Sequence, residues 1–178
     1  ETTGLGYPKA STMTLSVAFT VTTPVDPAVS TAAAINLPSG GTAEVDIPQN
    51  TFPVSVILTV STTSVPATNI ETIKVTGIGL NISAGGQQPT NDIIVTIYYQ
   101  DSDVVGLDES KLTLGRYDDI RDRWIILPSV VDTVNNKIVA RINHLSQFAV
   151  LQMVPASNLS GAKVYPNPYN PVKHPAGI

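Results

Sequence analysis

Apolar side chains alternate with small or polar ones along most of this 178-residue chain. The segment 15–21 reads LSVAFTV and the segment 44–47 reads EVDI. Successive side chains of a strand point to opposite faces, so a period of two is typical of half-buried strands, whereas an amphipathic helix needs a period of 3.6. Helical periodicity is hard to find elsewhere, and the sequence therefore predicts an all-β fold.

Turn signals divide the chain into about ten strands at roughly 8–12-residue spacing, which is typical of a sandwich or a barrel. Thr23–Pro27 contains two prolines, and we expect it to be a linker that cannot pair in a ladder. Gly77 and Gly79 indicate a bulge or a close backbone contact within a strand. The hairpin loop 118–122 and the 135–136 turn are expected between strands. A short helical turn is expected only within 103–112.

Composition narrows the function classes. Only 13% of residues are charged, against about 25% in an average globular domain. Ser, Thr and Val fill their place, as in exported proteins with neutral, hydroxyl-rich surfaces. The net charge of −4 gives a phosphate backbone no general reason to bind, so we expect no nucleic-acid partner. Cysteine is absent, which excludes thiol catalysis and zinc–thiolate sites. No apolar stretch reaches the length of about 18 residues that a membrane-spanning helix needs.

The C-terminal tail carries a specific motif. Lys163–Pro171 reads KVYPNPYNP. This run resembles the opening of the immunoglobulin-like C-terminal domain of many exported bacterial proteins, which is similar to the domain of the flagellar hook-cap protein and to type IX secretion sorting domains. In that family, further strands follow. We therefore expect the natural polypeptide to continue beyond Ile178, and this fragment alone to be unable to act as a sorting signal.

A second resemblance covers about 35–151. Leu37–Pro48 reads LPSGGTAEVDIP and is similar to the start of a ZU-type domain, the β-sandwich of zonula occludens proteins, netrin receptors and ankyrins. The order of Leu112–Leu114, Trp124, Val131–Thr133 and Asn143–Val150 follows bacterial relatives, which usually have Phe where Leu145 stands. The resemblance implies an antiparallel β-sandwich that serves protein contact or scaffolding. The expected division is an extended N-terminal strand and proline linker (1–30), the sandwich (31–154), and a linker with the truncated C-terminal domain (155–178).

The resemblance also directs attention to His144 and Ser146. In some ZU-type domains a His-Phe-Ser sequence cleaves itself, because the serine hydroxyl attacks the preceding carbonyl with the histidine as base. Here the bond cleaved would be Leu145–Ser146. The alternative is that both side chains hydrogen-bond at the beginning of a strand. Hydrolysis of another substrate is not favoured, since the chain has no Gly-x-Ser-x-Gly elbow and its other histidine, His174, lies in the proline-rich tail.

Two further groups suggest ligands. Asp101, Asp103, Asp108 and Glu109 could supply oxygen ligands to calcium, although their spacing is not that of an EF-hand, and the alternative is a solvated acidic loop. Trp124 could stack on a sugar, but its apolar neighbours favour a core position. Tyr98 and Tyr99 point to opposite faces, so at most one is expected on the surface.

The segment Met13–Val21 could add a strand to the sheet of another subunit. Together these observations favour a non-catalytic structural or scaffolding module of a secreted or cell-surface bacterial protein. If the module self-assembles, we expect it to form a filament or surface layer by strand addition. The alternatives are a carbohydrate- or partner-binding adhesion module and an autoproteolytic domain that cleaves before Ser146. We expect no cofactor and no metal in the leading case.

Overall fold

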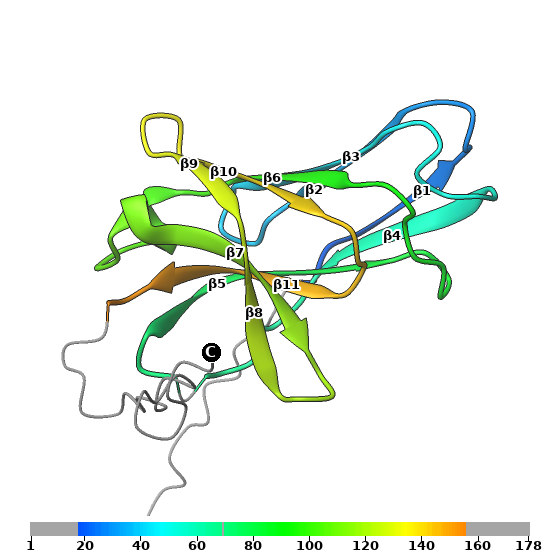
Figure 1. Ribbon diagram of the computed structural model, residues 1–178. Helices are drawn as coiled ribbons and strands as arrows, with labels where there is room; N and C mark the ends of the chain where they lie inside the picture. The colour runs from blue at the N-terminus through cyan, green and yellow to red at the C-terminus, as the bar shows by residue number, and fades with distance from the viewer. Residues whose placement is uncertain (1–17, 69, 156–178) are drawn as a thin grey trace, which may run out of the picture.

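Two antiparallel sheets face each other in the structure, a computed structural model that describes residues 18–68 and 70–155. Figure 1 shows the two layers edge-on, with β2, β3, β6, β9 and β10 in one and the remaining strands in the other. The predicted all-β sandwich is therefore confirmed. None of the helices in the described ranges is long and apolar enough to cross a membrane.

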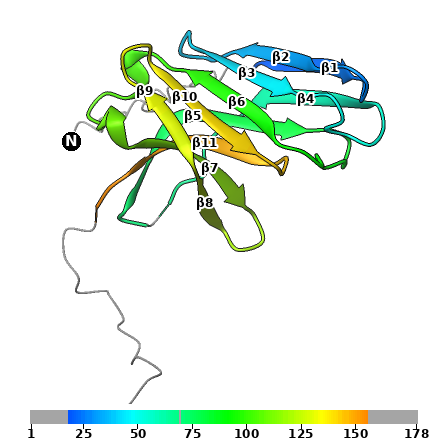
Figure 2. The same ribbon diagram turned by 45° about the horizontal axis from the view of Figure 1, so that its top comes forward.

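The six-stranded sheet has the strand order β1-β4-β5-β11-β7-β8. Its strands are β1 (Thr20–Val25), β4 (Val56–Thr62), β5 (Ile73–Ser83), β11 (Gln147–Met153), β7 (Leu112–Asp118) and β8 (Arg123–Leu127). The β7–β8 hairpin projects beyond the other strands (Figure 2). Asp118 and Arg123 form the last pair of this hairpin, so its loop lies within the predicted range 118–122.

The five-stranded sheet has the order β2-β3-β6-β10-β9. Its strands are β2 (Thr31–Asn36), β3 (Thr42–Ile47), β6 (Ile93–Tyr98), β10 (Lys137–Ile142) and β9 (Ser129–Asp132). Two 3₁₀ helices, η1 (Asp101–Asp103) and η2 (Glu109–Lys111), lie between β6 and β7, so η2 lies within the range predicted for a helical turn, whereas η1 begins two residues before that range. The turn predicted at 135–136 joins β9 to β10.

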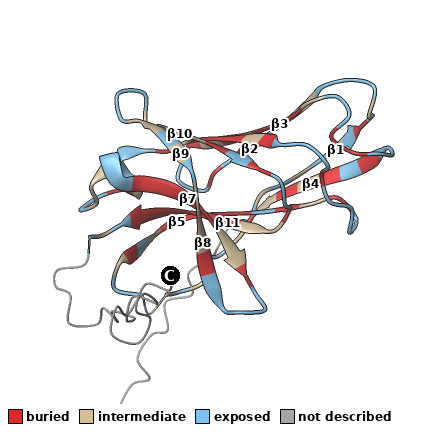
Figure 3. Ribbon diagram, in the orientation of Figure 1, coloured by how far each residue is buried: buried red, intermediate tan, exposed pale blue. Residues whose placement is uncertain are grey.

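The inner faces of the sheets form one core, and their burial follows the predicted period of two (Figure 3). In β3, Ala43, Val45 and Ile47 are buried while the residues between them are half-buried. Burying one such aliphatic side chain contributes about 1.5–3 kcal/mol to folding. The alternation therefore fixes which face of each strand meets the opposite sheet.

A second cluster, the outer cluster, lies on the other face of the six-stranded sheet. It consists of Ile73, Trp124, Ala149 and Leu151, and Val65 from the β4–β5 connection packs on it. Ala149 and Leu151 alternate along β11 with residues of the inner core, so β11 is buried on both faces. The β4–β5 connection thus covers the outer face of the sheet.

Gly79 permits this crossing. The carbonyl oxygen of Thr63 lies 2.5 Å and the side chain of Val65 2.9 Å from the position that a Cβ atom on Gly79 would occupy. The predicted close backbone contact is therefore confirmed for Gly79, and the register between β5 and β11 is irregular between Ala149 and Leu151, opposite this part of β5. Gly77 has open space at the same position.

The prediction that Thr23–Pro27 cannot pair is wrong for its first half. Pro24 pairs with Ile57 and Val25 with Val56, within a continuous β1–β4 ladder. β1 is the outermost strand of its sheet, and an edge position tolerates proline because one side of an edge strand needs no amide donor. The part of Met13–Val21 up to residue 17, like the tail from residue 156, lies outside the described residues.

We predict that Gly79→Ala lowers the free energy of unfolding by about 1–3 kcal/mol, because the new methyl group overlaps a backbone oxygen. Gly77→Ala is the matched control, since its Cβ meets nothing within 4 Å. Urea unfolding of both variants measures the difference. Equal stabilities would contradict the crossing described above.

Asp118 makes the hairpin sensitive to acid. Its carboxylate accepts a hydrogen bond from the Arg121 guanidinium at 3.0 Å and another from the Arg121 backbone N–H at 3.2 Å. The hydrogen bond from the Arg121 side chain is the main reason why the pKa of Asp118 lies below its ordinary value of 3.8. Asp118 and Arg121 thus form a local ion pair within this loop.

Because the folded state lowers this pKa, the stabilisation is complete above about pH 5 and is lost as the pH falls through the unfolded-state value of 3.8 and then the folded-state value. We predict that Asp118→Asn flattens the loss of stability between about pH 5 and pH 3. Denaturant unfolding across that range, with the exposed Asp119→Asn as control, measures the slope. A slope unchanged by Asp118→Asn would show that other carboxylates govern acid unfolding.

Candidate functional site

The β10–β11 corner, residues 143–146, contains the pair predicted for self-cleavage. His144 is exposed, whereas Leu145 is buried in the inner core. Gln88, from the β5–β6 loop, binds both polar groups of the Leu145 backbone: its Oε1 accepts from the N–H at 2.6 Å and its Nε2 donates to the carbonyl at 3.3 Å. One carboxamide therefore holds the corner against the neighbouring loop.

Ser146 serves the structure by two hydrogen bonds. Its hydroxyl donates to the Tyr117 carbonyl at 3.1 Å, and its carbonyl accepts from the Ile82 N–H at 3.0 Å. The corner thereby joins β7 and β5. None of the hydrogen bonds found in the described part of the chain involves the His144 side chain.

This geometry provides one of the elements that self-cleavage needs. The Gln88 Nε2 donor lies at the Leu145 carbonyl, where negative charge would develop on attack by Ser146. The hydroxyl, however, is directed to Tyr117 and not to His144. Among the described residues other than glycine, positive φ occurs at Asn50, Asp122 and Asn136, so the strained backbone lies away from the corner.

The four acidic residues predicted as calcium ligands have separate hydrogen-bond partners. The Asp101 carboxylate accepts a hydrogen bond from the Asn136 side-chain amide at 2.5 Å, and the Asp103 carboxylate accepts from the Ser39 hydroxyl and the Gln100 N–H. The Asp108 carboxylate accepts from the Ser110 hydroxyl, and the Glu109 carboxylate accepts from the Tyr99 hydroxyl at 2.8 Å. Within 18–68 and 70–155, no three His, Cys, Asp or Glu side chains come together as a metal site would require. The structure thus uses these carboxylates to hold η1 and η2.

The pKa values of Tyr99 and Asp108 are shifted by their surroundings. Burial is the main cause that raises the pKa of Tyr99, and its hydrogen bond to Glu109 adds to it. The pKa of Asp108 is lowered, mainly by its contact with Lys111, whose Nζ lies 2.7 Å from the Asp108 carboxylate. Both shifts favour the hydrogen-bonded form present in the fold: a neutral tyrosine donor and an ionised aspartate.

The aromatic residues weighed as sugar platforms are mostly covered. Trp124 is 5% exposed, its indole N–H donates to the Pro66 carbonyl at 3.3 Å, and its ring centroid lies 5.1 Å from that of Tyr117. The core position expected for Trp124 is confirmed, in the outer cluster. Tyr99 is buried and Tyr98 half-buried. The large apolar side chains that are exposed in the described part of the chain are all aliphatic.

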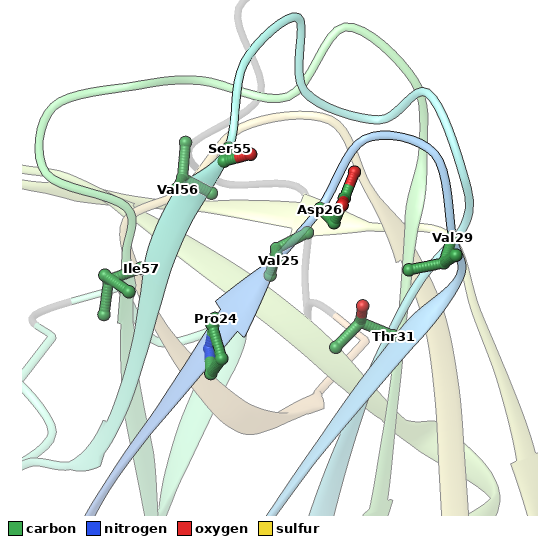
Figure 4. A pocket seen from close by; sticks show the side chains of 8 residues that line it. All are labelled: Pro24, Val25, Asp26, Val29, Thr31, Ser55, Val56 and Ile57. Carbon is green, nitrogen blue, oxygen red and sulfur yellow. The ribbon is translucent and has the colours of Figure 1, made fainter.

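An apolar hollow of about 370 Å³ lies where β1, β2 and β4 meet (Figure 4). Pro24 and Val25 line it from β1, and Val56 from β4. The side chains of Val29 and Ile57 at its rim are more than half exposed. Sequence patterns do not predict this hollow, because its residues come from separate segments. Within β4, the one sequence feature that indicates the hollow is Ile57, an apolar residue at a position of the strand that faces outward.

No protein-family model matches the chain, and no curated protein shows significant sequence similarity to it.

We predict that Gln88→Glu lowers the free energy of unfolding by about 1–3 kcal/mol, because a carboxylate cannot donate to the Leu145 carbonyl and leaves a partly buried acceptor unpaired. Gln87→Glu is the control for added charge, since only the backbone N–H of Gln87 is hydrogen-bonded. Thermal unfolding of both variants tests this difference. If the two substitutions had the same effect, Gln88 would not hold the corner.

Proposed function

We propose that this chain is a non-catalytic structural module of a secreted or cell-surface bacterial protein. The observation that carries the proposal is that the polar side chains at the candidate sites form hydrogen bonds that hold the fold together. Ser146 binds the β7 backbone, Gln88 binds the corner, and Glu109 binds Tyr99. Polar side chains that hold strand ends together favour a rigid spacer or scaffold over a reaction site.

The proposed compartment is supported by sequence features. A low content of charged residues and hydroxyl-rich outer faces are typical of exported proteins, and the tail 163–171 resembles the domain that follows many exported bacterial proteins. The ZU-type resemblance of 35–151 supports a scaffolding role in particular. Protein partners fit the exposed aliphatic residues around the hollow better than sugars do, because sugar-binding modules use aromatic side chains.

Self-assembly by strand addition is the second candidate. In the part of the chain that the structure describes, β1 and β2 are edge strands, and this favours self-assembly because edge strands present backbone groups that can pair with another chain. Thr20 and Val21, however, already pair with Ser61 and Val60 of their own β4. Donation of the whole segment Met13–Val21 to a neighbour would therefore require β1 to leave its sheet, as in domain swapping.

Three measurements on the purified chain and one on intact cells test the proposal together. We expect one intact polypeptide by mass spectrometry, no retention on a glycan array, and surface exposure on intact cells of the source organism by protease shaving. Fragments meeting at Ser146 would establish autoproteolysis instead. Specific glycan binding would establish an adhesion module, and polymers by light scattering would establish self-assembly.

A further inference from the structure

The β7–β8 hairpin presents one apolar side chain at its tip. Ile120 lies in the loop that joins the two strands, and it is 89% exposed. The hairpin itself projects beyond the neighbouring strands (Figure 2). Turns are usually built from Gly, Pro, Asn, Asp or Ser, and water is the least favourable surrounding for an isoleucine side chain. The tip therefore gains from any contact that buries Ile120.

Hydrogen bonds on both sides of Ile120 hold the loop that presents it. The Asp118 carboxylate accepts from the guanidinium of Arg121 at 3.0 Å and from its backbone N–H at 3.2 Å. The Tyr117 hydroxyl donates to the Asp122 carboxylate. Because the loop is already held in this way, burying its tip requires little further ordering, and such preorganisation lowers the cost of association.

The apolar hollow at β1, β2 and β4 has the size and the chemistry to receive such a side chain. Its volume of about 370 Å³ is well above the volume of about 150 Å³ in which an apolar cavity binds a benzene molecule. Val25 lines it from β1 and Val29 from the turn before β2 (Figure 4). That turn is held in place, since the Asn50 N–H donates to the Pro27 carbonyl at 2.7 Å.

We propose that the Ile120 tip of one copy of this chain inserts into the apolar hollow of a second copy. The two features do not meet within one molecule, because β1 and β8 are opposite edges of the six-stranded sheet, separated by five strand spacings or about 24 Å. An apolar side chain and a complementary hollow on different parts of one surface produce a heterologous contact. Each copy then uses its tip on one neighbour and its hollow on another.

The charges around the tip and the hollow are complementary on one side. Asp26 is the charged residue among those that line the hollow, and the sequence has no Lys or Arg from 10 to 73. Arg123, three residues after Ile120, is exposed, and so is Asp119 just before it. The hairpin therefore enters with its arginine side toward Asp26 and its Asp119 side away from it. This charge pattern gives the contact a single orientation.

This inference rests on the scaffolding function proposed above, for which it names a contact between copies. The contact does not use strand addition, so every described strand keeps its place in its own sheet. The two proposals can fail separately. A strictly monomeric chain on the cell surface would contradict the contact alone, whereas an associating chain confined to the cytoplasm would contradict the proposed function alone.

Complementation between two variants of the full chain tests the contact. Ile120→Asp removes the apolar tip and keeps the hollow, whereas Ile57→Asp places a charge at the rim of the hollow, where Ile57 is 58% exposed, and keeps the tip. In sedimentation velocity between about 10 μM and 1 mM, we expect the unmodified chain to associate and each variant alone to associate at least about tenfold more weakly. An equimolar mixture of the variants should form a 1:1 heterodimer, because the pair has one intact tip and one intact hollow.

Val134→Asp is the matched control, because Val134 is 90% exposed in the turn between β9 and β10. We expect its association to stay within about twofold of that of the unmodified chain, and thermal unfolding checks that all variants are folded. Association that persists in both Ile120→Asp and Ile57→Asp would show that copies meet elsewhere, for example through edge strands. That result would overturn the proposal, as would a monomeric unmodified chain at every concentration or a mixture of variants that stays monomeric.

Discussion

The contact of the Thr63 carbonyl with Gly79 determines much of this sandwich. Because residue 79 has no side chain, β4 can leave the six-stranded sheet there, and the connection to β5 can cross its outer face. The crossing covers Trp124 and Leu151 in the outer cluster. Among the described residues, β4 pairs with β5 only at Leu80–Ser83. The second hydrophobic layer therefore originates in this crossing.

The polar residues near the strand ends act as ties in the same structure. The Gln88 carboxamide satisfies both backbone groups of Leu145, and Ser146 joins its corner to β7. Buried or half-buried backbone groups are costly without partners, so these bonds stabilise a corner that apolar packing alone would leave unsatisfied. The same bonds occupy the serine that self-cleavage would need. The structural use of these residues is the reason for preferring a scaffold to a catalyst.

The local sequence, read from its period of two, its turn residues and the apolar neighbours of Trp124, was sufficient to predict the fold class, most strand positions and the burial of Trp124. It failed at Pro24, because an edge position that accepts proline is a property of the sheet and not of the local sequence. It could not predict the hollow, the Gln88–Leu145 pairing or the outer cluster. Each depends on residues far apart in the chain, such as Pro66 and Trp124, which only the completed topology brings together. The four acidic residues weighed as calcium ligands have separate hydrogen-bond partners, and these partners also come from distant parts of the chain for Asp101 and Asp103.

The β4–β5 connection crosses the outer face and covers the one tryptophan of the chain, and the rest of the interpretation depends on this crossing. Intrinsic fluorescence of the native protein tests it directly, because Trp124 is the sole indole. We expect blue-shifted emission and weak quenching by acrylamide, both of which become those of free indole on unfolding. Native emission at the wavelength of a solvated indole, with full access to the quencher, would contradict the crossing.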